Sequence, residues 1–526
     1  MNIRDFLRKP LAYYLIWILV MGLLTTLIFL LKAGAAWLLL GMIPLLLFVC
    51  RPDSQLHSTP TSKKSLMWQI LTILVMVLTI AACILPMDQL PIWNGELPAH
   101  RNQYELMAEN LLEGRLYIKY GDEDLLRGLR NPYDPELRKS AGVPYHWDHA
   151  YYNGHYYMYF GIVPVLLVFL PYRLLSGHSL TTYHATQLFV ATAIIGIFSL
   201  FHLLAKRFFP KLPRGITLAA AVAVSVMSVW YSTAEPALYC TAITAGISLE
   251  IWSLYCFFRA VWIEKAENRQ ILWAGIGALL GALVFGCRPT IALANIIVLP
   301  MLFVFLRQRK FTRKLLGKLV LAALPYAVVA AGLMLYNYAR FDDPFEFGQA
   351  YQLTVADQSN YAVVLNRQTI VKLWNGLGEN FFDIPKLSAA FPYVNLGGAF
   401  INFPMLFVVF FCFQPTVRLR MKQKQLTGTF TFFLISTVII TCMDILWTPY
   451  LLERYRMDIY FLLGIAAFLV IGFLHSVSSQ PAQKKLNTAV MVFSVITVLS
   501  CALFCLRRVN VYYEDKVQQI AQFWVG

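Results

Sequence analysis

The chain has 526 residues, of which 58% are hydrophobic and only 14% are charged. A soluble protein of this length would need roughly 25% charged residues to coat the surfaces of two or more domains. The composition therefore excludes a soluble enzyme, a coiled coil, a disordered chain and a disulfide scaffold. It indicates an all-α polytopic membrane protein.

Thirteen apolar runs are candidate membrane-spanning helices, which need about 20 residues each. A further run, 160–175, is short and contains Pro164 and Pro171, so we expect it to be juxtamembrane or re-entrant. The thirteen predicted spans are 11–31, 34–50, 67–86, 183–205, 215–232, 237–258, 271–287, 289–306, 319–337, 399–415, 427–447, 457–475 and 487–506.

The net charge of +16 is compatible with nucleic-acid binding or with orientation in a membrane. The basic residues form short clusters between the apolar runs, and seven clusters fall on one side if 160–175 does not cross. That side is predicted to be cytoplasmic, with the N-terminus there and no nucleic-acid partner. The clusters are Arg4/Arg8/Lys9, Arg51/Lys63/Lys64, Lys206/Arg207/Lys211/Arg214, Arg259/Lys265/Arg269, Arg307/Arg309/Lys310/Arg313/Lys314/Lys318, Arg418/Arg420/Lys422/Lys424 and Lys484/Lys485.

This sidedness places three loops outside: 87–182, 338–398 and 448–456. A tail over 507–526 is expected to be outside and solvated. The predicted organisation is an N-terminal hairpin and loop over 1–66, a core over 67–475, and a last helix with its tail over 476–526.

Polar and aromatic groups concentrate in the first outer loop. Asp148 stands in a stretch rich in tyrosine and histidine, 145–161, and could be a general base, a metal ligand or a turn residue. His146 and His149 beside Asp148, and the triplet Asp122-Glu-Asp124, make a divalent metal a possible cofactor, although no metal ligand is assigned.

Other residues of this loop have both structural and functional interpretations. Aromatic rings such as Trp147 stack on sugars and also anchor at the bilayer interface. Residues 102–114 have helical spacing of apolar groups and predict an amphipathic helix, in which Glu105 fits a helix cap.

Four arginines are predicted near the outer interface: Arg288, Arg340, Arg454 and Arg456. An arginine at the end of a span can snorkel, or its planar guanidinium can bind phosphate. Their common depth suggests a site for an anionic lipid headgroup. Glu235 is predicted at the same level, where it could position one of them.

Several motifs resemble the GT-C glycosyltransferases, multispan enzymes that take sugars from polyprenyl-phosphate donors. The resemblance covers roughly 67–475 and includes a bacterial branch of glycosyltransferases. The motifs are Tyr104-x-x-x-Ala108-x-x-x-Leu112-x-Gly114, Asn131-Pro-Tyr-Asp134-Pro, Asp148 with Tyr156-Tyr-Met-Tyr-Phe-Gly161-x-x-Pro164, Tyr336-Asn-Tyr-x-Arg340-Phe-x-x-Pro344-Phe-Glu-Phe-Gly348 and Glu453-Arg-Tyr-Arg456.

The resemblance implies inverting sugar transfer to the hydroxyl of a glycan, lipid or protein, at the outer face of a bacterial plasma membrane. The family's usual acid before the helix tyrosine is His100 here, so the expected base is Asp148, with His100 and Glu105 as alternatives. Arg340, Arg454, Arg456 and Arg288 are expected to bind the donor phosphate, and Asp134, Trp147, Tyr156, Tyr157 and Glu346 the sugar or acceptor. The alternatives are a flippase or transporter of lipid-linked sugars, a polysaccharide polymerase or ligase, and an inactive scaffold.

Overall fold

The structure is a computed structural model that describes residues 10–31, 40–41, 43, 46, 49–51, 55–62, 65–89, 103–236, 238–359, 364–389, 391–447, 452–511 and 514–525. In chain order the elements are α2 Pro10–Leu31, η2 Gln55–His57, α4 Leu66–Ile84, η3 Leu85–Gln89, α5 Gln103–Leu112, η6 Glu123–Leu126, α6 Pro135–Ala141, β1 His149–Tyr152, β2 His155–Met158, η7 Val165–Phe169, α7 Leu170–Ser176, α8 Thr182–Phe208, α9 Arg214–Ala234, α10 Leu238–Phe258, η8 Arg259–Ile263, α11 Glu267–Phe285, α12 Pro289–Ala292, η9 Leu293–Ile297, α13 Val298–Arg307, α14 Arg313–Phe341, α15 Arg367–Phe382, α16 Ala399–Asn402, η10 Pro404–Phe413, α17 Pro415–Gln423, α18 Thr427–Trp447, η11 Glu453–Arg456, α19 Met457–Val477, α20 Gln480–Asn510 and α21 Glu514–Val525.

Ten helical stretches of the described chain are long and apolar enough to cross a membrane, and each coincides with a predicted span. The all-α polytopic membrane fold is thereby confirmed. The ten are Leu66–Met87, Thr182–Phe208, Arg214–Ala234, Leu238–Ile263, Glu267–Phe285, Pro289–Arg307, Arg313–Phe341, Thr427–Trp447, Glu453–Val477 and Gln480–Asn510.

The predicted count of thirteen spans is not confirmed. Run 11–31 forms α2, whose described apolar part, Leu15–Ile28, is shorter than the ten spans, and run 34–50 lies largely outside the described residues. Run 399–415 is divided into α16 and η10 at Phe403, because Pro404 has no N–H to continue the first helix. The short run 160–175 contains η7 and α7, which together are too short to span.

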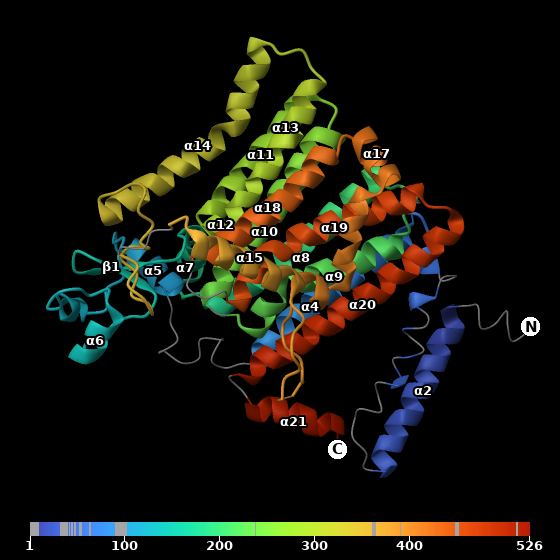
Figure 1. Ribbon diagram of the computed structural model, residues 1–526, viewed down its shortest axis with the longest axis horizontal. Coiled ribbons are helices and arrows are strands. Elements are labelled where there is room, and N and C mark those ends of the chain that lie inside the picture. The colour runs from blue at the N-terminus through green and yellow to red at the C-terminus, as the bar shows by residue number, and fades with distance from the viewer. Residues whose placement is uncertain are drawn as a thin grey trace, which may run out of the picture.

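Helix α19 forms the centre of the bundle. Its sequence is apolar on every side, which is typical of a helix without a solvent or lipid face, and every residue of its apolar window is buried inside the bundle. The Phe468 ring stacks on Phe201 of α8, with the ring centroids 4.1 Å apart. In contrast, only 6% of the corresponding window of α14 is buried, and this proline-containing helix runs along the edge of the bundle (Figure 1).

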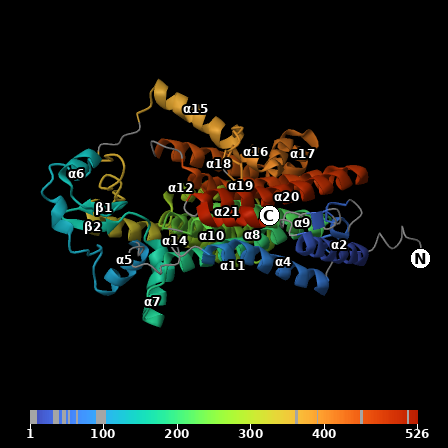
Figure 2. The ribbon, with the colours of Figure 1, turned by 90° about the horizontal axis from the view of Figure 1, so that it is seen from below.

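A small extramembrane unit caps one end of the bundle. The antiparallel hairpin β1–β2 lies there with α5 and α6 (Figures 1 and 2). Asn153 and Gly154 connect the strands with φ of 48° and 78°, as a two-residue hairpin turn requires. We call this end, where α10 begins and α18 and α20 end, the hairpin end, and the opposite end the far end.

The predicted tail over 507–526 is helical in its described part. Helix α20 continues to Asn510, and α21 follows as a second helix. Arg507 and Arg508 form ion pairs with Glu453 and Glu235, at 2.8 and 2.5 Å. These contacts attach the start of the tail to the bundle.

Candidate functional site

Asp148 is held in an unusual backbone conformation immediately before β1. Its φ of 54° lies in the left-handed region, which few residues other than glycine adopt and which often marks a functional position. Three hydrogen bonds fix the conformation. The Asp148 N–H donates to the Leu353 carbonyl at 3.0 Å, the Leu353 N–H donates to His149 at 2.8 Å, and the Gln103 amide donates to the Asp148 carbonyl at 2.6 Å.

The carboxylate of Asp148 is buried, with 6% of the residue exposed. One oxygen accepts a hydrogen bond from the hydroxyl of Tyr239, at the start of α10, and the other accepts from the Gln352 amide at 2.9 Å. Burial raises the pKa of Asp148 above its usual value, while hydrogen bonds from its neighbours and the charge of Arg454 oppose this rise. A buried carboxylate with a raised pKa is suited to accept a proton.

Arg454 of η11 lies on the other side of Tyr239. Its guanidinium carbon is 4.0 Å from the centroid of the Tyr239 ring and 5.3 Å from that of Tyr455. Among the described residues, the guanidinium has these ring contacts but neither a hydrogen bond nor an ion pair. Its N–H donors are therefore available to a ligand.

Arg288 is a second cation beside one of these rings, that of Tyr455. Its guanidinium carbon lies 5.0 Å from the centroid of Tyr455. The Arg288 Nε donates to Asp458 at 2.5 Å, and its NH2 lies 4.0 Å from Asp444. Two buried acids, Asp444 and Asp458, thus hold the partly buried Arg288 in the turn between α11 and α12. Buried carboxylates need such a close cationic partner.

The turn that carries Arg288 packs tightly on the end of β2. A Cβ added to Gly161 would lie 2.1 Å from the Gly286 carbonyl, and the same carbonyl accepts from the Val163 N–H at 2.9 Å. Only a glycine at position 161 permits this approach. The contact joins the Asp148 segment to the Arg288 turn.

Trp147 and Tyr159 flank this site. Trp147 is 46% exposed, in contrast to its neighbour Asp148, and it adjoins Tyr239. The Gln103 side chain accepts from the Tyr159 N–H at 2.9 Å through the same amide group that holds Asp148. An exposed indole beside a buried carboxylate is suited to stack on a sugar.

Two of the predicted phosphate-binding arginines have other partners. Arg340 is buried between the rings of Tyr336 and Phe341 and donates to the Met158 carbonyl at 2.9 Å and to Asn337 at 2.7 Å. These contacts attach α14 to the end of β2.

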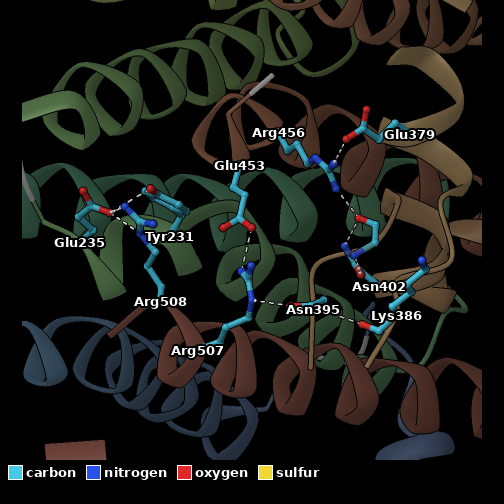
Figure 3. A network of polar contacts seen from close by, with 11 residues as sticks. Tyr231, Glu235, Glu379, Lys386, Asn395, Asn402, Glu453, Arg456, Arg507 and Arg508 are labelled. Carbon is cyan, nitrogen blue, oxygen red and sulfur yellow. Dashed lines mark hydrogen bonds and ion pairs between the residues drawn. The ribbon is translucent and has the colours of Figure 1, made fainter. Parts of the chain in front are cut away.

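Arg456 lies in a separate polar network, shown in Figure 3. It donates to the Gly397 carbonyl at 2.5 Å and pairs with Glu379 at 3.7 Å. Asn402 also donates to this carbonyl, at 2.6 Å. Like Arg340, Arg456 is occupied in joining segments of the chain.

Figure 3 also shows the partner of Glu235. Its carboxylate accepts from Arg508, which is not one of the four predicted arginines, at 2.5 Å and from the Tyr231 hydroxyl at 2.9 Å. Nearby, Arg507 binds Glu453 and Asn395, at 2.8 and 3.2 Å. Because Glu453 precedes Arg454, helix α20 holds the segment that carries the free guanidinium.

The remaining acidic candidates accept structural hydrogen bonds. Glu105 accepts from the N–H of Thr182 at 2.9 Å, so it satisfies a backbone donor at the start of α8. Asp134 caps α6 by accepting from Glu136 and Leu137 N–H groups. Glu346 accepts from the Gly348 N–H at 2.5 Å. His100 lies outside the described residues.

The predicted tyrosines pack in the extramembrane unit. Tyr156 is fully buried and Tyr157 is 7% exposed, and their rings contact Tyr120 and Phe341, respectively. Neither ring is open to stack on a sugar.

The candidate metal ligands are engaged separately. His146 binds Asp122 at 3.0 Å, while His149 contacts the Trp147 carbonyl at 2.9 Å and the Tyr120 hydroxyl at 2.8 Å. Burial lowers the pKa of His149 to about 4, so its ring is neutral near pH 7. No group of three potential metal-ligating side chains was found within the described part of the chain.

Sequence reasoning missed Tyr239, Gln352, Tyr455 and Asp458. Asp458 could have been found, since it begins an apolar span, where an acid is costly and often functional. The others carry no sequence signal, because tyrosines and amides are common near membrane interfaces.

Together, the helices and this cluster describe a polytopic membrane protein with an acid and two arginines gathered at one end of its bundle. No protein-family model matches the sequence, and no curated protein matches it. Among solved structures, the chain is similar to ArnT from Cupriavidus metallidurans, in a crystal structure bound to undecaprenyl phosphate. The similarity covers 88% of this chain and 75% of that chain, with 12% sequence identity and a TM-score of 0.40.

Proposed function

We propose that this protein transfers a sugar from a polyprenyl-phosphate donor to an acceptor hydroxyl, with inversion at the anomeric carbon. One observation carries the proposal: the Asp148 carboxylate binds the hydroxyl of Tyr239, while the Arg454 guanidinium lies 4.0 Å from the centroid of that ring. A base and a cation that has neither a hydrogen bond nor an ion pair among the described residues therefore contact one tyrosine. Sugar transfer from a lipid phosphate needs both groups. The base takes the proton of the attacking hydroxyl, and the cation stabilises the negative charge of the leaving phosphate.

In the proposed step, the acceptor oxygen attacks the anomeric carbon and its proton passes to Asp148. A bond forms between acceptor oxygen and carbon, and the bond between the anomeric carbon and the phosphate oxygen breaks. The electron pair of that bond leaves with the polyprenyl phosphate, which gains negative charge. Fixed cations aimed at a developing charge are usually the largest contribution to such catalysis.

Arg454 is assigned to this developing charge because its donors are free among the described residues. Arg288 supports it from the adjacent turn, where Asp458 and Asp444 orient its guanidinium. Arg340 and Arg456, whose donors hold backbone carbonyls, are left out of the phosphate site. This assignment narrows the four expected arginines to two.

Trp147 is assigned to the sugar or the acceptor because it is exposed beside Asp148. We place the site at the outer face of a bacterial plasma membrane. In this orientation the positively charged far end of the bundle faces the cytoplasm. The acceptor is a glycan, a lipid or a protein.

The direct test uses purified full-length protein with a radiolabelled polyprenyl-phosphate sugar and a mixture of envelope glycans, lipids and peptides. Release of polyprenyl phosphate together with label on an acceptor is the expected result. If the labelled lipid crosses a sealed vesicle without cleavage, the protein is a flippase. If neither cleavage nor movement occurs with donors of several sugar types, the transferase proposal is wrong and an inactive scaffold is favoured.

A further inference from the structure

A second polar cavity lies at the far end of the bundle, on the other side of the predicted membrane from Asp148. Its volume is about 830 Å³. The end of α8, the connection from η8 to α11, the end of α13 and the end of α17 supply its walls. These four connections are far apart in sequence and meet only in the folded bundle.

Four cations line this cavity: Arg207, Lys265, Arg309 and Lys424. Within the described chain, none of the four forms an ion pair with an acid. Arg207 donates its Nε to the Trp262 carbonyl at 2.8 Å, and its terminal nitrogens have no hydrogen bond among the described residues. Arg309 donates to the Phe305 carbonyl at 3.1 Å and to the Gln270 side chain. The lining includes one acid, Glu264, whose carboxylate is already paired with Arg259 at 2.7 Å.

Like charges in one cavity repel each other, and an anion bound between them removes this cost. Arginine and lysine donors form strong, charge-assisted hydrogen bonds to phosphate oxygens. The C-terminal ends of α8, α13 and α17 also line the cavity. Their partial negative charge offsets part of the positive charge of the four cations. The charge that remains without an acidic partner favours a ligand with one or more phosphate groups.

The wall next to Lys265 is apolar. Trp262, which is 9% exposed, and Ile263, which is 37% exposed, end the span that leads into the cavity. A tryptophan at the end of a span is typical of the level of lipid headgroups. Basic pockets between transmembrane helices on this side of a membrane bind anionic headgroups.

We propose that this cavity binds the phosphate group of an anionic membrane phospholipid. The acyl chains would pass along the apolar wall while the four cations hold the headgroup. This site is separate from the proposed sugar-transfer site and does not depend on that function, because no residue is shared between them.

The test measures the melting temperature of the purified full-length protein in a neutral detergent. Three probes are added at equal concentration: dioctanoyl phosphatidylglycerol, dioctanoyl phosphatidylcholine and inorganic phosphate. The variant is Lys265→Gln with Lys424→Gln. The matched control is Lys211→Gln with Lys485→Gln, which removes the same charge from exposed positions that do not line the cavity.

Phosphatidylglycerol should raise the melting temperature of the wild type and the control, but phosphatidylcholine should not. Without lipid, the cavity variant should melt at the same temperature as the wild type or higher, because two mutually repelling charges are removed. Its apparent Kd for phosphatidylglycerol should be about tenfold higher or more. If phosphatidylglycerol raises the melting temperature of the cavity variant and of the control equally, the proposed site is wrong. If inorganic phosphate raises the melting temperature as much as phosphatidylglycerol does, the ligand is a soluble phosphate and not a lipid.

Discussion

The hydroxyl of Tyr239 donates a hydrogen bond to the carboxylate of Asp148, although the two residues are 91 positions apart. One belongs to the first turn of a membrane-spanning helix and the other to the extramembrane hairpin. The bond joins the two parts of the protein at the point where the proposed lipid-linked donor and its acceptor would meet.

Replacing Asp148 with asparagine should lower kcat for sugar transfer by about 10²–10⁴-fold, because the amide cannot accept the acceptor's proton. Asparagine tolerates a positive φ, so the fold should survive. Asp342→Asn is the matched control, since Asp342 is also left-handed, with a φ of 57°, but it lies outside the site. Normal turnover in the Asp148 variant would remove this carboxylate from the mechanism.

The rate should fall at low pH as Asp148 becomes protonated, since a base must be ionised to act. Burial raises its pKa above the usual value, so the loss should occur at higher pH than for an exposed aspartate. The bond from Tyr239 lowers this pKa, and Tyr239→Phe should therefore move the acid limb of kcat/KM to still higher pH. An unmoved acid limb in the variant would show that another group titrates.

Substitution of Arg454 should affect catalysis, whereas substitution of Arg456 should affect the stability of the fold. Arg454→Gln should reduce kcat/KM for the donor by about 10²–10³-fold with an unchanged melting temperature, because its donors have no other partner among the described residues. Arg456→Gln should instead lower the free energy of unfolding by about 1–3 kcal/mol, since it removes a buried bond to the Gly397 carbonyl. Activity assays and thermal unfolding of both variants separate the roles, and the reverse pattern would contradict them.

Arg507→Gln should raise KM for the donor about two- to fivefold and change kcat little. The substitution breaks a half-buried ion pair with Glu453, which is a modest loss of energy, but it loosens the segment that carries Arg454. Arg173→Gln breaks a pair of similar exposure with Glu109, away from the arginines, and serves as the control. Equal KM values for the two variants would show that Arg507 does not position Arg454.

Glu250 should be a destabilising residue. It lies fully buried in the middle of α10, and neither carboxylate oxygen has a hydrogen-bond partner among the described residues. Glu250→Met should therefore raise the free energy of unfolding by about 1–3 kcal/mol. Glu235→Met, which removes a carboxylate paired with Arg508, should lower it. A loss of stability in the Glu250 variant would indicate that this carboxyl has a partner.

Much of the fold could be predicted from hydropathy. All ten candidate spans fall on predicted runs, because lipid requires each crossing segment to satisfy its own backbone hydrogen bonds within a continuous apolar helix. The division at Phe403 and the ordered tail were missed. The effect of Pro404 on the hydrogen bonds of α16 and the pairing of Arg507 with Glu453 both depend on the groups that surround these residues in the folded protein.

The sequence by itself determined the membrane class and the helical spans, and it indicated the segment around Asp148 as a candidate site, since these follow from local composition and spacing. The tertiary structure alone decided which charged groups are free and which are already paired. Arg454 and Arg456 are two positions apart and look equivalent in sequence, yet one guanidinium lies over Tyr239 and the other holds the Gly397 carbonyl. Whether an arginine can bind a ligand depends on its neighbours in space, and these neighbours come from segments more than fifty residues away.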